Sequence, residues 1–305
     1  MWLILAFMSA ALLGCYDSLK KQALKANAVL PVLTLNTLFS SLIFLPFIVT
    51  SAFGLIPDNS IFHVESGGWE VHRYIVLKSL IVLSSWILGY FGMKHLPLTI
   101  VGPINATRPV MVLIGALLVF GERLNGWQWM GVALAVISFF LLSRSGKKEG
   151  IDFKHDHWIY MIVGAAALGA VSGLYDKYLM APQSEGGIGL DRMMVQSWYN
   201  IYQLMMMTAM LILLWWPKHK QTTPFHWSWS ILGVSLFLST ADFLYFYSLS
   251  LPSAMISIVS MIRRGSVIVS FLFGAAFFHE KNLRAKAFDL ALVLLGMVFL
   301  YIGSK

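Results

Sequence analysis

Charged side chains are scarce in this chain, and cysteine is almost absent. Only 12% of its 305 residues are Asp, Glu, Lys or Arg, whereas 58% are hydrophobic. An ordinary soluble domain is roughly a quarter charged. Together with a mean hydropathy of +0.74, this composition excludes a water-soluble globular protein. The single cysteine, Cys15, excludes an intrachain disulfide.

The sequence also lacks the short motifs on which catalysis or cofactor binding depends. It contains no HExxH, no GxSxG, no P-loop and no Cys or His cluster with metal-ligand spacing. His155 and His157 are close in sequence, but they stand in a polar stretch of mixed charge. We therefore expect no enzyme activity, no cofactor or metal, and no ATP-driven transport by this chain alone.

Positive charge is spread thinly along the chain. The 22 Lys and Arg residues, against 14 Asp and Glu, occur in short polar segments and not in a tail or on one face. Such scatter is typical of topology signals between membrane helices, so nucleic acid is not an expected partner. No basic segment precedes the apolar run that begins at Trp2, so a cleavable signal peptide is not expected.

What the chain has instead is a series of long apolar runs. A membrane-spanning helix needs about 20 apolar residues, and we predict ten such helices in an all-α membrane protein. The runs cover residues 2–22, 29–53, 74–93, 98–120, 126–143, 158–180, 195–216, 229–249, 253–278 and 286–303. The charged linker 144–157 separates an N-terminal half, 1–143, from a C-terminal half, 158–305.

The two halves resemble each other weakly in sequence. The matching positions, in the same order in both halves, are Tyr16 and Tyr175, Asp17 and Asp176, Asn36 and Asn200, Tyr90 and Tyr245, Arg108 and Arg263, and Glu122 and Glu280. Because each half has an odd number of helices, the second must enter the membrane from the opposite face. We predict two inverted five-helix repeats, which place a binding site near the midplane and permit alternating access.

The orientation in the membrane follows from the polar segments. Those on the side of the linker 144–157 hold most of the Lys and Arg residues, and Lys78 is counted on the poorer side. The positive-inside rule then places both termini outside the cytoplasm. The family resemblance described below implies the opposite orientation.

Charges inside predicted spans are candidates for function, because each costs roughly 2.5–3.5 kcal/mol on insertion scales. Arg108 and Arg263 lie near the centres of their runs, Arg264 adjoins Arg263, and Asp242 lies just past the middle of the eighth run. If the arginines face a shared cavity, they would favour an anionic group such as a carboxylate or a phosphate.

Three alternatives remain open for these charges. Arg263 could pair with Asp242 between neighbouring helices, and Arg108 could bind carbonyls that Pro103 and Pro109 free from the helix ladder. Asp242 could instead be the proton site of a coupled transporter.

Asp17 and Asp176 would lie near opposite membrane faces after inversion, which suits gating. A local ion pair of Asp17 with Lys20 or Lys21 is the alternative.

Two carboxylates stand directly before predicted helices. Glu122 and Glu280 precede the fifth and tenth runs, where the helix dipole favours an acid, so we expect them to cap these helices. Asp289 follows Lys286 by three residues, and we expect it to pair with that lysine on an exposed face.

Aromatic and amide side chains complete the predicted substrate site. We expect contacts from the repeat-matched Tyr90, Tyr245, Asn36 and Asn200. Weaker candidates are Trp86, Tyr175, Tyr199 and Gln203.

The end of each half carries the clearest family resemblance. Residues 117–142 read LLVFGERLNGWQWMGVALAVISFFLL, and residues 271–300 read FLFGAAFFHEKNLRAKAFDLALVLLGMVFL. Five helices per half, a Pro-containing turn and a G-E or H-E step before the fifth helix resemble the EamA group of the drug/metabolite transporter superfamily. Asp289 replaces the small residue found at Gly131, and the run 262–265 is more charged than usual. Both departures agree with an anion-binding centre.

The resemblance implies a secondary transporter in a bacterial-type inner membrane, commonly an exporter of small metabolites. We expect a small organic metabolite, anionic or zwitterionic, as substrate, the lipid bilayer as surroundings, and a monomer or homodimer. The alternatives are proton-coupled cation or drug efflux on Asp242 and a lipid-handling accessory subunit with no transport cycle.

Overall fold

The computed structural model describes residues 2–112, 114, 125–147, 153–180, 183, 186–250, 259, 262–277 and 283–303. Every regular element in this part of the chain is helical. The helices are α1 (Trp2–Ala23), α2 (Val29–Ala52), α3 (Trp69–His95), α4 (Leu98–Ala106), α6 (Gly126–Lys147), α7 (His157–Met180), α8 (Arg192–Met210), α9 (Trp229–Ser250), α11 (Ser266–Phe277) and α12 (Leu283–Gly303). A π-helical turn (Leu211–Trp215) and a 3₁₀ turn (Trp216–Lys218) continue α8.

Seven helices are long and apolar enough to cross a membrane. They are α1, α2, α3, α7, α8 with its continuation, α9 and α12. The prediction of an all-α membrane protein is therefore confirmed, and each predicted run overlaps one of the helices above. Ten spanning helices remain a prediction, because α4, α6 and α11 are not among these seven. Of these three, α4 and α11 are short in the described part of the chain.

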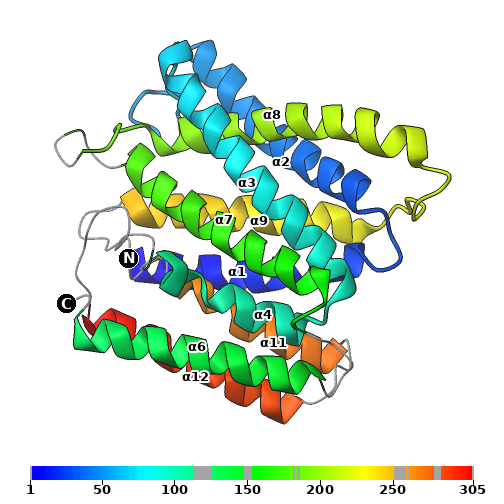
Figure 1. The fold of residues 1–305 in the computed structure, drawn as a ribbon. Helices are drawn as coiled ribbons and strands as arrows, with labels where there is room; N and C mark the ends of the chain where they lie inside the picture. Colours follow the sequence, from blue (N-terminus) through cyan, green and yellow to red (C-terminus); the bar gives the residue numbers. More distant parts are fainter. Residues whose placement is uncertain are drawn as a thin grey trace.

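Helices from the two predicted halves pair with each other. In Figure 1, α1 lies beside α9 and α3 lies beside α7, with α2 and α8 on one side and α6 and α12 on the other. The α4 helix packs against α11 in the same way. The two halves therefore interleave, and their contact surface runs through the middle of the molecule.

Small residues bring the paired helices close together. A Cβ at Gly14 of α1 would lie 2.3 Å from Cβ of Val269 on α11. The Ser9 hydroxyl donates to the Ala241 carbonyl at 2.6 Å, and the Ser85 hydroxyl donates to the Ala165 carbonyl at 2.7 Å. Close backbone approach and interhelical hydrogen bonds hold helices together where lipid removes the hydrophobic driving force.

Two lysines correct the sequence analysis. Lys78, counted as a cation of a polar segment, lies in α3 and is buried. Lys286, expected to be exposed, is fully buried in α12, and its Nζ donates to Oγ1 of Thr99 on α4 at 2.8 Å. Both predictions were wrong because a charge in a spanning helix avoids lipid and faces protein.

A buried asparagine joins the loop after α1 to the segment before α9. The Asn27 Nδ2 donates to the carbonyls of Ala23 at 3.0 Å and His226 at 2.7 Å, and its Oδ1 accepts from the His226 N–H at 2.9 Å. These bonds satisfy backbone groups at one end of the α1–α9 pair.

Replacing Asn27 with Ala should lower the free energy of unfolding by about 1–3 kcal/mol, because the partly buried N–H and carbonyl of His226 lose their hydrogen-bond partner. The measurement is the midpoint of thermal unfolding in detergent. Asn59→Ala, at an exposed loop position, is the matched control. Equal midpoints for the two variants would contradict a stabilising role for the Asn27 hydrogen bonds.

Candidate functional site

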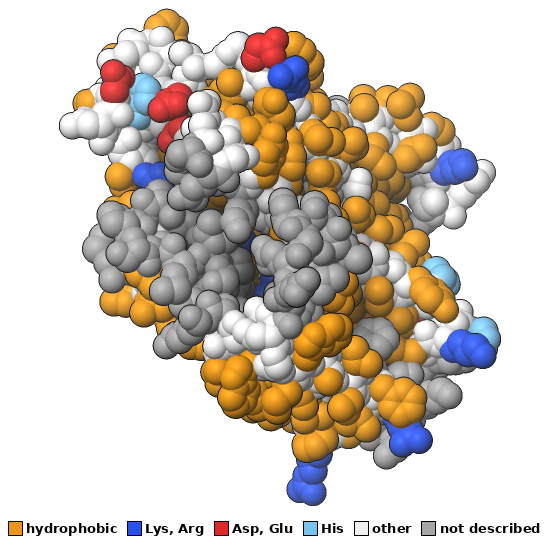
Figure 2. Space-filling view, turned by 60° about the vertical axis from the view of Figure 1, so that its left-hand side comes forward, with side chains coloured by type: hydrophobic (Ala, Val, Ile, Leu, Met, Phe, Trp, Pro, Cys, Tyr) orange, Lys and Arg blue, Asp and Glu red, His pale blue; other side chains and the backbone are white. Residues whose placement is uncertain are grey.

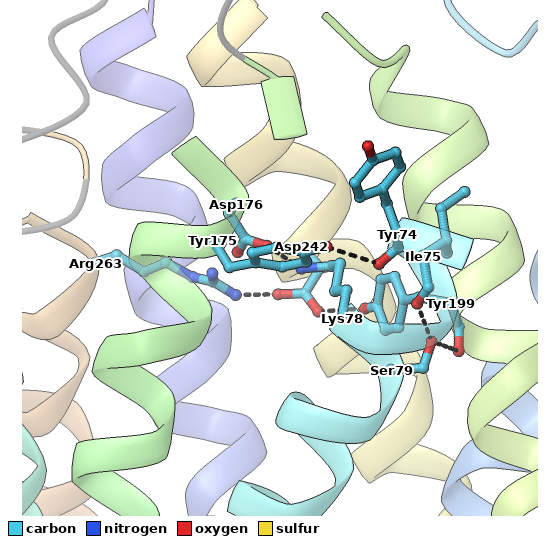
Figure 3. Close-up of polar contacts among 9 residues, drawn as sticks. All are labelled: Tyr74, Ile75, Lys78, Ser79, Tyr175, Asp176, Tyr199, Asp242 and Arg263. Atoms are coloured by element: carbon cyan, nitrogen blue, oxygen red, sulfur yellow. Dashed lines mark hydrogen bonds and ion pairs between the residues drawn. The ribbon is translucent and has the colours of Figure 1, made fainter. Parts of the chain in front are cut away.

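Five side chains, four of them buried and Arg263 partly buried, form an ion-pair network where helices of both halves meet (Figure 3). Lys78 of α3 forms an ion pair with Asp176 of α7, and Arg263 forms one with Asp242 of α9. The Tyr199 hydroxyl of α8 donates to Oδ2 of Asp242 at 2.9 Å. We call these five residues the central network. It joins the four helices α3, α7, α8 and α9 and the helical segment 262–264.

Aromatic rings surround the cations of the central network. The Arg263 guanidinium lies 4.1 Å from the centre of the Tyr245 ring, and the Lys78 ammonium lies 5.3 Å from that of Tyr199. Near the carboxylate of Asp176, the Tyr175 hydroxyl donates to the Tyr74 carbonyl at 3.3 Å (Figure 3). Ring faces attract cations most strongly where water is excluded, so the charges are compensated on several sides.

A second group of charges lies in the C-terminal part of α1. Lys20 forms an ion pair with Asp17 at 2.8 Å, and its ammonium lies 4.3 Å from the ring centre of Tyr16 and 5.2 Å from that of Tyr90. The local ion pair considered for Asp17 is therefore present. Tyr90, a predicted substrate contact, is buried beside it.

Two arginines stand between these groups, next to interruptions in their helices. Helix α4 is interrupted at Thr107, since Pro109 has no N–H to bond the carbonyl four residues earlier, and Arg108 follows directly. Arg264 precedes a turn at Gly265. Among the described residues, neither arginine has an ion-pair partner.

Positive charge is in excess at this centre. The cations are Lys20, Lys78, Arg108, Arg263 and Arg264, and the carboxylates are Asp17, Asp176 and Asp242. The charge of Arg264 interacts with those of Arg108 and Arg263 and with that of Asp17. Figure 2 shows a face on which the surface is hollowed and Lys or Arg side chains are visible inside. The arrangement can hold an anion.

The predicted site residues fall into separate groups. Asp242, Arg263 and Tyr245 come together, whereas Asn36 and Asn200 lie buried where α2 packs on α8. There the Asn200 Nδ2 donates to the Gln196 carbonyl at 2.8 Å. The buried amide of Asn36 has no hydrogen-bond partner within the described ranges.

Two predictions concern residues that the structure does not describe. Glu122 and Glu280, the predicted caps, lie outside the described residues. Among residues that the structure describes, no three His, Cys, Asp or Glu side chains gather as metal ligands.

Sequence reasoning missed Lys78 and ranked Tyr199 low. The signal for Lys78 was its place within the apolar run 74–93, since a charge in such a run is a functional candidate. Nothing in the sequence singled out Tyr199 from the many aromatic residues, because its role depends on which face of α8 meets Asp242.

Comparison with known proteins identifies the first half of the chain. Residues 1–144 match the model of the EamA-like transporter family. This range is a little under half of the chain's 305 residues. EamA proteins form part of the drug/metabolite transporter superfamily, so the predicted resemblance is confirmed over this range.

Two further similarities add detail to the EamA assignment. A stretch of 69 residues is 32% identical to the probable 4-amino-4-deoxy-L-arabinose-phosphoundecaprenol flippase subunit ArnE of Pectobacterium atrosepticum. That match covers 23% of this chain and 61% of the relative, so the chain spans less than two thirds of the relative's length. A solved crystal structure has a TM-score of 0.64 and 13% identity, over 99% of this chain and 96% of its own. At that identity the likeness establishes a shared fold alone.

The Lys78–Asp176 pair should behave as a coupled unit. Lys78→Met or Asp176→Asn alone should each cost about 3–5 kcal/mol of stability, because each leaves a buried charge uncompensated. The double variant should lose less than the sum of the two. The measurement is a double-mutant cycle on unfolding in detergent.

The control is the exposed Arg73–Glu70 pair, for which Arg73→Gln should cost no more than about 1 kcal/mol. Additive losses at Lys78 and Asp176 would contradict the ion pair.

Proposed function

We propose that this chain is a secondary active transporter that exports a small organic metabolite, anionic or zwitterionic, across an inner membrane by alternating access. The central network carries the proposal. Its charges come from helices of both predicted halves and are buried, although each would be costly in a membrane. Charges kept at such a cost, at the contact between two halves, suit a substrate site whose contacts change as the halves move.

The pairing of helices supports two inverted repeats. A two-fold axis that exchanges α1 with α7 and α3 with α9 turns the α1–α9 contact into the α7–α3 contact, and both are present. The same axis maps the α2–α8, α6–α12 and α4–α11 contacts onto themselves, and these are present too. Repeats of this kind rock against each other around a central site.

The two ends of the contact between the halves are held differently. Lys78 of α3 and Gly233 of α9 stand at the same sequence separation as Tyr90 and Tyr245. The repeat-matched position of Lys78 therefore carries no charge, and Asp17 pairs with Lys20 of its own helix. Only one end has an ion pair across the halves among the described residues, which supports a gating role for Asp176 at that end.

An anionic substrate could couple binding to movement through this network. A ligand shifts an equilibrium between conformations only by binding one of them better. With more cations than carboxylates at the centre, a substrate anion adds counter-charge that the protein lacks. The substrate would then stabilise the conformation in which the arginines contact it, relative to the conformation in which they do not.

A second candidate function comes from the curated relative. That protein is named as a probable flippase subunit for an aminoarabinose linked to phosphoundecaprenol. The similarity favours a lipid-linked substrate, handled together with a partner chain, as the alternative to a soluble metabolite.

The experiment is counterflow in liposomes that contain only this purified chain. We expect exchange with anionic or zwitterionic metabolites and none with cations. The absence of counterflow with every solute, together with activity that needs a partner chain, would instead support an accessory subunit.

Asp242→Asn tests the role of the network in transport. The variant should reduce counterflow about 10-fold or more, because Arg263 loses its counter-charge inside the protein. Asp58→Asn, at a side chain that is 97% exposed, is the matched control and should leave the rate unchanged. Normal counterflow with loss of only pH-driven efflux would contradict this account and favour proton-coupled efflux on Asp242.

A further inference from the structure

Arg108 and Arg264 differ from the other buried cations. Lys20, Lys78 and Arg263 each have a carboxylate partner. Within the described part of the chain, Arg108 and Arg264 have neither an ion pair nor a hydrogen bond from the guanidinium. The Arg108 Nε is buried without a hydrogen-bond partner. A guanidinium left in this state inside a membrane protein is costly, so a ligand that neutralises it would be bound strongly.

The space around Arg108 is shaped by a glycine of α7. A Cβ at Gly169 would lie 2.7 Å from both Cζ and Nη1 of Arg108. The guanidinium therefore lies against the α7 backbone, where only glycine leaves room for it. Because Arg108 follows α4 and Gly169 belongs to α7, this contact also joins the two halves.

Arg263 is less suited to hold a ligand than its neighbour. Its guanidinium is engaged by Asp242 and lies against the Tyr245 ring. The sequence favoured Arg108 with Arg263, whereas the contacts leave Arg108 and Arg264 available.

We infer that Arg108 and Arg264 together bind the substrate, and that the group they bind is a phosphate. The inference rests on the proposed transport function and names its substrate class. Two planar guanidinium forks each match a pair of oxygens, and a phosphate monoester presents three terminal oxygens. Its charge of about −1.5 to −2 at neutral pH balances both arginines, whereas a single carboxylate balances one. A soluble organic phosphate and a lipid phosphate offer the same chemistry.

The experiment measures ligand binding, so that it does not depend on transport. The purified chain is placed in phosphatidylcholine nanodiscs, and its thermal unfolding is followed with inorganic phosphate, glycerol 3-phosphate, succinate or chloride. A second set of nanodiscs contains phosphatidic acid. Arg108→Gln and Arg264→Gln should each weaken the phosphate effect roughly 10- to 100-fold. Arg284→Gln, at an exposed position of α12, should leave it unchanged.

If an arginine variant fails to fold, a pair of glycine variants on α7 provides an independent test of the site. Gly169→Ala should displace the Arg108 guanidinium and weaken phosphate binding without unfolding the protein, because a flexible side chain can move aside. Gly173→Ala, one turn further along α7, meets nothing within 4 Å and should bind phosphate normally. Equal binding by the two variants would overturn the placement of Arg108 in the site.

The outcomes separate the source of the phosphate from the existence of the site. Stabilisation by glycerol 3-phosphate indicates a soluble substrate, and stabilisation by phosphatidic acid alone indicates a lipid. Either supports the site if it depends on both arginines. A stronger effect of succinate, or no effect that depends on these arginines, would overturn the assignment. Phosphate binding without counterflow would refute transport and leave the site standing. Counterflow of a zwitterionic metabolite that does not depend on these arginines would refute the phosphate site and leave the proposed transport function standing.

Discussion

An ionised side chain is tolerated inside a membrane protein only where the protein supplies its counter-charge, because lipid supplies none. This constraint governs the centre of the molecule. Three carboxylates and five cations meet there, and three ion pairs account for six of these charges. The Lys78–Asp176 pair joins helices of opposite halves. The halves cannot separate at that end without exposing both charges to water or leaving them unpaired.

Close helix packing makes this arrangement possible. Gly14 and Gly169 have no side chain, which leaves room where α1 meets α11 and where α7 meets Arg108. Serine hydroxyls on α1 and α3 bond to carbonyls of the paired helices. These contacts resist lateral separation of the helices but contain no charge. The two ends of the interface therefore differ in the ion pairs that join the halves among the described residues.

The sequence predicted the helices well because apolar length is a local property. The run 74–93 became α3, which extends from Trp69 to His95. The sequence also identified Asp242 and Arg263 as candidates, since a charge within an apolar run can be recognised without any knowledge of packing. It could not predict that Lys78 meets Asp176, because helices that are apolar nearly all round do not disclose which faces touch. The burial of Lys286 against Thr99 was missed for the same reason.

In the proposed transport cycle, the halves part at the Lys78–Asp176 end. The Tyr175 hydroxyl of α7 donates to the Tyr74 carbonyl of α3, so these two positions are close across the halves. In a Cys15→Ser background, Tyr74 and Tyr175 would each be replaced by cysteine, and the two cysteines would be joined by a short bifunctional thiosulfonate. Counterflow would be measured before cross-linking, after it, and after reduction. The account predicts loss of counterflow on cross-linking and recovery on reduction. Undiminished counterflow by the fully cross-linked protein would contradict it.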